Sequence, residues 1–182
     1  FEAFYHYYTI EDFTQAFQVL RKKINDNVYP RNRYAYLRYR GYSSYLIDCF
    51  KKVEDHLDNI GKIHTLGSIG VCYYCNNEYK LAIESLEKCE HLIESETDYK
   101  AKRLHSECLK FLADCNYWIG NSQKAIEYCY AALEATRKID QLKESDADDS
   151  ESSYPDRIQS NIYLSLAFIQ YGLGEYEESL LR

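Results

Sequence analysis

The 182-residue sequence contains no methionine and few residues that interrupt regular structure. With only 2 Pro and 7 Gly, long and mostly helical elements are expected. No apolar run approaches the roughly 20 residues that a bilayer span requires, and the first residues lack the pattern of a signal peptide. We therefore expect no membrane insertion and an intracellular, cytoplasmic location, including nuclear, cytoskeletal or ciliary assemblies. The absence of methionine, even at position 1, favours the interpretation that this sequence is a segment of a larger protein.

The charge and cysteine content narrow the function classes further. Hydrophobic residues make up 46% and charged residues 28%, which is a globular composition. The net charge of -7 argues against nucleic-acid binding, because the chain as a whole repels phosphates. The cysteines number 7, an odd count in a chain too long to need disulfide bonds, so reduced thiols are expected.

One sequence motif occurs three times along the chain. Each copy has a small residue, and twelve positions later another small residue followed by an apolar one: Gly70 with Ala82-Ile83, Ala113 with Ala125-Ile126, and Ala167 with Ser179-Leu180. Apolar residues at helical spacing surround each pair. A residue that tolerates left-handed backbone stands where the first helix of each copy must end: Asn77, Gly120 and Gly174.

These residues resemble the tetratricopeptide (TPR) repeat, in which two antiparallel helices pack through small residues and neighbouring pairs stack. The resemblance implies an all-α fold, an α-solenoid of stacked antiparallel helix pairs. The spacing of 43 residues from Gly70 to Ala113 exceeds the usual length of about 34. It looks more like the long repeats of kinesin light chain and of bacterial peptide sensors.

The spacing of the three copies predicts how the chain is divided into repeats. Residues 1–62 form a degenerate helical repeat or cap, with helices expected at 10–24 and 44–57. Residues 63–97 and 98–143 form repeats 1 and 2, and residues 157–182 form a truncated repeat 3. Between them, residues 144–156 have no apolar period and are expected to be an exposed acidic loop, with Pro155 at the start of the next helix. Ser145 precedes acidic residues in this loop, which makes it a candidate phosphorylation site.

Candidate catalytic and metal motifs are weak. Cys72 and Cys75 form a CxxC pair that could bind zinc or act in redox chemistry, but the register places Cys72 and Cys115 in one helix position, as small apolar residues. His105-Ser106-Glu107 is half of a zinc deaminase signature without its second half. The carboxylates of the acidic loop lack the glycine and terminal glutamate of a calcium loop. We expect no catalytic residues, no metal, no cofactor and no small-molecule substrate.

The TPR resemblance implies that the first helix of each pair lines a groove that binds a peptide or partner helix. Tyrosines share one position of the register, which is typical of recognition surfaces, although tyrosine also serves as filler in a chain with 20 of them. The residues expected to contact a partner are Tyr74, Lys110, Asp114, Tyr117, Phe168 and Tyr171. Gly67, Val71, Leu164 and Phe168 occupy positions where chaperone-binding members carry polar residues, so an acidic chaperone tail is not the expected ligand.

Arg31, Arg33, Arg38 and Arg40 alternate with tyrosines and define a possible second surface. Arginine with tyrosine can stack on single-stranded bases, pack on neighbouring helices, or dock a partner. The sequence as a whole favours a non-catalytic protein-protein interaction scaffold or adaptor within a larger complex. The alternatives are a peptide-sensing domain that controls an attached output domain and, third, an enzyme.

Overall fold

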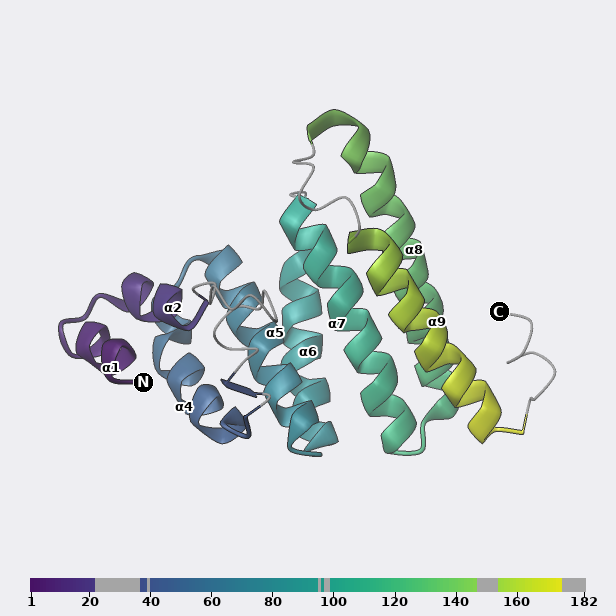
Figure 1. The fold of residues 1–182 in the computed structure, drawn as a ribbon, viewed down its shortest axis with the longest axis horizontal. Coiled ribbons are helices and arrows are strands. Elements are labelled where there is room, and N and C mark those ends of the chain that lie inside the picture. The colour runs from purple at the N-terminus through teal and green to yellow at the C-terminus, as the bar shows by residue number, and fades with distance from the viewer. Residues whose placement is uncertain (22–36, 39, 95, 97–98, 147–153, 175–182) are drawn as a thin grey trace. The chain divides into compact units, whose positions relative to one another are not determined.

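A computed structural model describes residues 1–21, 37–38, 40–94, 96, 99–146 and 154–174 (Figure 1). Within these ranges the chain forms α-helices, one short 3-10 helix and no strand. The helices are α1 (Glu2–Thr9), α2 (Phe13–Arg21), α4 (Ser43–Val53), η1 (Glu54–His56), α5 (Asn59–Cys75), α6 (Tyr79–Glu94), α7 (Tyr99–Trp118), α8 (Ser122–Asp146) and α9 (Tyr154–Gly172). None of the helices in these ranges is long and apolar enough to cross a membrane.

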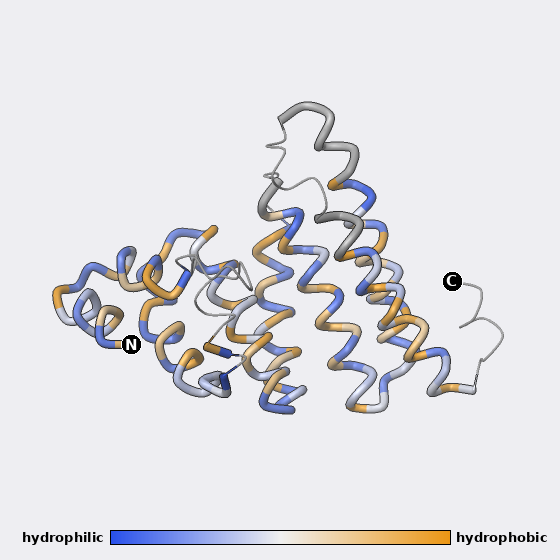
Figure 2. Tube along the Cα trace, viewed as in Figure 1, coloured by the Kyte–Doolittle hydropathy of each residue, from blue (hydrophilic) through white to orange (hydrophobic). Residues whose placement is uncertain are grey.

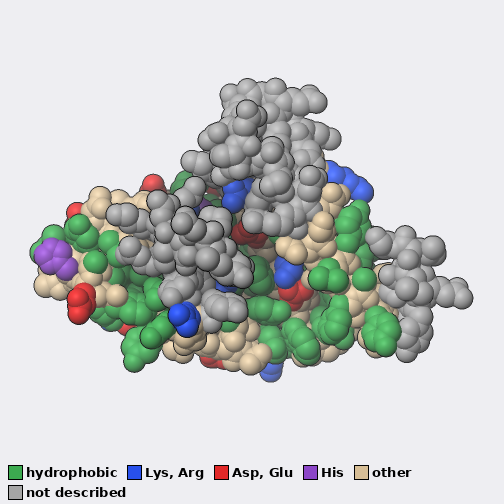
Figure 3. All heavy atoms as spheres, viewed as in Figure 1, with side chains coloured by type: hydrophobic (Ala, Val, Ile, Leu, Met, Phe, Trp, Pro, Cys, Tyr) green, Lys and Arg blue, Asp and Glu red, His purple; other side chains and the backbone are tan. Residues whose placement is uncertain are grey.

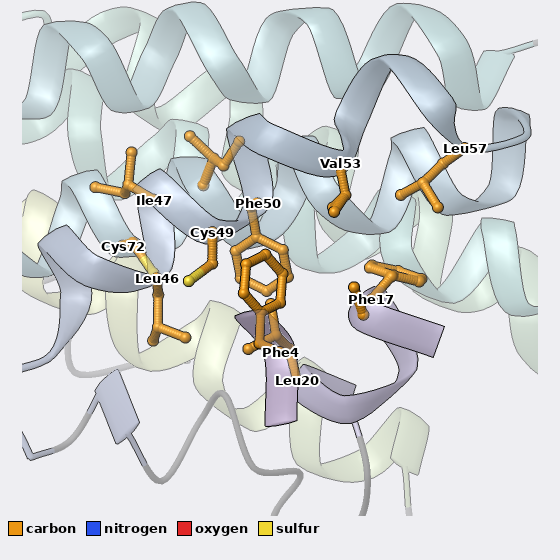
Figure 4. Packing of buried hydrophobic residues seen from close by; sticks show 12 residues of the cluster. Phe4, Phe17, Leu20, Leu46, Ile47, Cys49, Phe50, Val53, Leu57 and Cys72 are labelled. Atoms are coloured by element: carbon orange, nitrogen blue, oxygen red, sulfur yellow. The ribbon is translucent and has the colours of Figure 1, made fainter. Parts of the chain in front are cut away.

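The chain divides into two compact units, Phe1–Ser85 and Leu86–Arg182, and the division falls inside α6. In the first unit, α1 packs on α2 and α4 packs on α5. Phe4, Phe17 and Leu20 of α1 and α2 lie against Phe50 of α4 in one buried cluster (Figure 4). The rings of Phe17 and Phe50 meet edge to face at 6.5 Å. Burial of such large apolar side chains contributes roughly 1.5–3 kcal/mol each, so this cluster is the core of the unit.

In the second unit, α7 packs on α8, and α9 packs on both of them. Ser106 of α7 and Thr136 of α8 are fully buried, and their hydroxyl groups are 2.6 Å apart. The Ser106 hydroxyl also contacts the carbonyl oxygen of Ala132, at 3.2 Å. Since buried polar groups are costly without partners, this contact tolerates little change in the register of the two helices.

The amphipathic pattern that predicts the helices is visible along the chain. Hydrophobic and hydrophilic residues alternate in short runs on each described helix (Figure 2). The predicted close-packing residues Gly70, Ala82, Ala113 and Ala125 are all buried. Ala167 is half-buried, and its predicted partner Ser179 lies outside the described residues.

The predicted helix ends are confirmed. Asn77 has φ 63°, Gly120 has φ 88° and Gly174 has φ 82°, and each stands just beyond the first helix of its pair. Left-handed backbone at this position lets the amide groups after the helix reach its last carbonyl groups. The N–H of Glu78, for example, donates to the carbonyl of Tyr73 at 2.9 Å.

Several predicted boundaries differ from the structure. The helix expected at 10–24 begins only at Phe13, because Glu11 adopts φ 59° and Asp12 caps the helix by accepting from the N–H of Gln15 at 3.1 Å. Helix α8 continues to Asp146, so the first three residues of the predicted acidic loop are helical. Helix α9 begins at Tyr154 with Pro155 in its first turn, as predicted for that proline. The rest of the loop, residues 147–153, lies outside the described residues.

Candidate functional site: an apolar face on α7 and α9

The predicted contact residues of the second unit lie on α7 and α9, which pack side by side. Tyr117 and Trp118 end α7, and their rings are 5.5 Å apart. Phe168 of α9 lies edge-on to Tyr117 at 5.5 Å and is 6.3 Å from Trp118. The structure therefore brings together two of the predicted residues, Tyr117 and Phe168, from positions about fifty residues apart in the chain.

Helix α9 exposes three large apolar side chains. Leu164 is 70%, Phe168 53% and Tyr171 60% exposed, and the three residues are spaced to share one side of the helix. We call Tyr117, Trp118, Leu164, Phe168 and Tyr171 the α7–α9 face. Hydrophobic side chains gather over the carboxyl-terminal halves of these two helices in Figure 3. Contiguous exposed apolar surface of this kind marks an interaction site more often than a solvated surface.

Gly172 determines how Tyr117 lies on this face. A Cβ atom at position 172 would come within 2.5 Å of the Tyr117 hydroxyl oxygen, so the tyrosine occupies space that only glycine leaves open. Tyr117 is half-buried there, whereas Tyr171, at the equivalent position of the third copy, is exposed. Of these two tyrosines at one register position, Tyr117 is thus covered by the next helix and Tyr171 is open.

Lys110 and Asp114, also predicted to contact a partner, pair with each other. The Lys110 ammonium donates to an Asp114 carboxylate oxygen at 2.6 Å, and the two side chains are 19% and 11% exposed. The Lys110 ammonium also lies 4.6 Å from the centre of the Phe111 ring. The pair neutralises its own charge, so this part of α7 presents little net field to a ligand.

The other predicted residues lie elsewhere. Tyr74 is on α5 of the first unit, half-buried, with its ring 5.9 Å from that of Tyr79. Arg38 is half-buried and Arg40 exposed, while Arg31 and Arg33 lie outside the described residues. The side chain of Ser145, at the end of α8, lies outside them too.

Sequence reasoning did not select Trp118 or Gly172. Both stand five residues after the small residue of their copy, at Ala113 and Ala167, so the repeat register relates them. Trp118 is also the only tryptophan of the chain. Its place in the repeat register and the rarity of tryptophan in this chain are two signals that could have identified Trp118.

Six of the seven cysteines are buried packing residues. Cys72 lies in the last turn of α5, where burial raises its pKa to about 12, while Cys75 is exposed. Burial likewise raises the pKa of Cys115 to about 12. Among the described residues, no three His, Cys, Asp or Glu side chains come close enough together to hold a metal ion.

Comparison with known proteins identifies the architecture. No protein-family model matches the chain, and no curated protein matches its sequence. A solved structure of a kinesin light chain from Podosopora anserina with nearly identical TPR-like repeats matches with a TM-score of 0.55 and 14% sequence identity. The match covers 98% of this chain and 87% of that one. A variant of the same protein matches with a TM-score of 0.54.

The chain has a TPR-like repeat fold. It is an all-α solenoid of stacked antiparallel helix pairs, as the three copies of the sequence motif predict. In this fold α7 and α9 are the first helices of successive pairs, because each precedes its positive-φ residue, Gly120 or Gly174. Of the α7–α9 face, Tyr117, Leu164, Phe168 and Tyr171 occupy register positions that the resemblance assigns to a groove, and Trp118 stands next to one of them.

Proposed function

We propose that this chain is a non-catalytic protein-interaction scaffold within a larger assembly, and that the α7–α9 face docks a partner helix or peptide. The observation that supports the proposal best is the exposure of Leu164, Phe168 and Tyr171 along one side of α9. These side chains offer large contact area with few torsions to immobilise, which favours binding.

The charges around the face favour an apolar ligand. The stretch from Ile158 to Gly174 contains no Asp, Glu, Lys, Arg or His. On α7, Lys110 already pairs with Asp114. An acidic peptide would gain little electrostatic attraction here, whereas an amphipathic helix could bury apolar residues at positions i, i+3 or i+4, and i+7 against the face.

The rings are also held in place before binding. Tyr117 contacts Phe168, Trp118 and the backbone at Gly172, so part of the ordering cost of docking is already met in the free protein. We expect Phe168 and Tyr171 to dominate the affinity, because aromatic residues at the centre of an interface carry most of its binding energy.

Site-specific photocrosslinking in cells that express the full-length protein tests the proposal. Leu164 is replaced by a photoreactive phenylalanine analogue, and Tyr130 of α8, 43% exposed, is replaced in the same way as a matched control. Docking on the α7–α9 face is supported if position 164 gives a discrete crosslinked partner that position 130 does not give. That crosslink should also be lost in Phe168→Ser. Equal crosslinking at both positions, or an unchanged crosslink in Phe168→Ser, would contradict it.

A further inference from the structure

Two buried cysteines lie where the end of α6 meets α7 (Figure 1). The thiol of Cys108, on α7, donates to the carbonyl oxygen of Leu86, on α6, at 3.2 Å. About one turn further along α6, a carboxylate oxygen of Glu90 is 3.9 Å from Nε2 of His105 on α7. Cys89 stands between Leu86 and Glu90 in the sequence. The contact between the two helices therefore passes Cys89 on both sides, and all of these residues belong to the second unit.

The helix geometry directs both sulfur atoms toward one carbonyl group. A side chain on a helix leans toward the N-terminus and lies over the residue three or four positions earlier. The Cys89 side chain therefore leans toward Leu86, whose carbonyl oxygen accepts from Cys108. The two thiols also form a hydrogen bond with each other. Cys89 is 1% and Cys108 3% exposed, so the pair is enclosed.

The repeat register explains why the two helices come this close. Cys89 stands nineteen residues after Gly70, and Ala132 stands nineteen residues after Ala113, so the two residues share one register position. Both are buried. A small side chain at this position allows a close approach of the neighbouring helix, and a disulfide requires such an approach, with Cβ atoms about 3.5–4.5 Å apart.

The enclosed pair reacts only when the helices open. The hydrogen bond with Cys89, together with burial, raises the pKa of Cys108 well above its ordinary value. Cys108 therefore keeps its proton at neutral pH and is a poor nucleophile while α6 and α7 are closed. Folded proteins open locally at rates set by local stability, so the rate of oxidation should follow the opening of these two helices.

We infer that Cys89 and Cys108 are a redox modification site, at which hydrogen peroxide converts the two thiols to a disulfide that joins α6 to α7. One thiol loses its proton and its sulfur attacks a peroxide oxygen, so the O–O bond breaks and a sulfenic acid and water form. The second sulfur attacks the sulfenic sulfur, the S–O bond breaks, and the leaving hydroxide takes the second proton as water. The thiols lose two electrons, and one peroxide becomes two waters.

The neighbouring thiol determines the product. A sulfenic acid at either cysteine forms beside the other sulfur, so the disulfide closes before more peroxide can produce an irreversible sulfinic acid. The bond then holds α6 against α7 until a thiol reductant reverses it. The inference is independent of the α7–α9 face, because it uses none of the residues of that face.

Mass spectrometry of the whole chain after treatment with hydrogen peroxide tests the inference. Remaining thiols are blocked with N-ethylmaleimide, and the chain is digested with trypsin without reduction. Trypsin places the two cysteines in peptides 89–100 and 104–110, so the disulfide appears as these peptides joined and two hydrogens lighter than their sum. We expect this link as the main oxidation product. The thermal midpoint should rise by about 5 °C or more, and dithiothreitol should reverse the rise.

Matched variants of two buried cysteines on α7 control for packing. Cys108→Ala should lose both the link and the rise in thermal midpoint on oxidation, whereas Cys115→Ala should keep both. Each variant is compared oxidised and reduced, which removes the effect of the substitution itself on stability. The inference is overturned if the folded chain forms no link between peptides 89–100 and 104–110, if that link forms only in urea, or if oxidation stabilises Cys108→Ala as much as the parent.

Discussion

Replacement of Gly172 by alanine tests the central contact of the α7–α9 face. The new Cβ would lie 2.5 Å from the Tyr117 hydroxyl oxygen and 3.3 Å from the ring carbon that carries it. The first distance is too short for any stable contact, so the Tyr117 ring must move. That ring also touches Trp118 and Phe168, and its displacement should therefore disturb the whole face.

Two opposing effects set the magnitude. Alanine is favoured over glycine in a helix by up to about 1 kcal/mol, and by less at the last residue of α9. Inserting a methyl group into a packed contact costs about 1–3 kcal/mol. We expect the clash to win, with a net loss of unfolding free energy of about 1 kcal/mol.

A double-mutant cycle isolates the contact. Tyr117→Phe removes the oxygen nearest to the new Cβ and leaves the 3.3 Å contact, which a shift of a few tenths of an ångström relieves. In that background Gly172→Ala should be neutral or stabilising, and the coupling free energy between the two substitutions should be about 1 kcal/mol or more.

Urea unfolding followed by the fluorescence of Trp118, the only tryptophan, reports on this part of the chain directly. Circular dichroism on the same samples measures helix content. If Gly172→Ala stabilises the protein equally with and without the Tyr117 hydroxyl, and the emission of Trp118 does not change, then Tyr117 does not rest on Gly172 and the described face is wrong.

Three further predictions concern other features. Lys110→Met leaves the Asp114 carboxylate, 11% exposed, without its cation and should lower the unfolding free energy by about 1–3 kcal/mol. Lys110→Met/Asp114→Leu should recover most of that loss in the same urea titration, and a single variant as stable as the parent would contradict the pairing. At about pH 8 a thiol reagent should modify Cys75 rapidly and Cys72 only on unfolding, because Cys75 is exposed while burial raises the pKa of Cys72 to about 12. Peptide mapping by mass spectrometry distinguishes the two sites, and equal rates would refute the burial of Cys72. Asn77, with φ 63°, should tolerate Asn77→Gly, whereas Asn77→Ala should lower the thermal midpoint by the equivalent of about 1 kcal/mol, and equal midpoints would argue against the left-handed helix end.

The sequence alone determined the fold class and the places where the first helices end. Asn77, Gly120 and Gly174 lie within one turn of the helices that they end. Their effect is local, because a residue with left-handed backbone ends the helix directly before it. The repeated small residues likewise predict close helix pairs. Both signals are local or periodic, and they can be identified without knowing which helices meet.

Only the tertiary structure decided what lies on each surface. Tyr117 and Tyr171 share one register position, yet α9 covers the first ring and leaves the second exposed. The rings of Phe1 and Tyr42 lie 5.9 Å apart, measured between ring centres, although about forty residues separate them in the chain. Spacing along a helix assigns a side chain to a face, but its neighbours across the solenoid determine whether that side chain is buried, paired or left open to a partner.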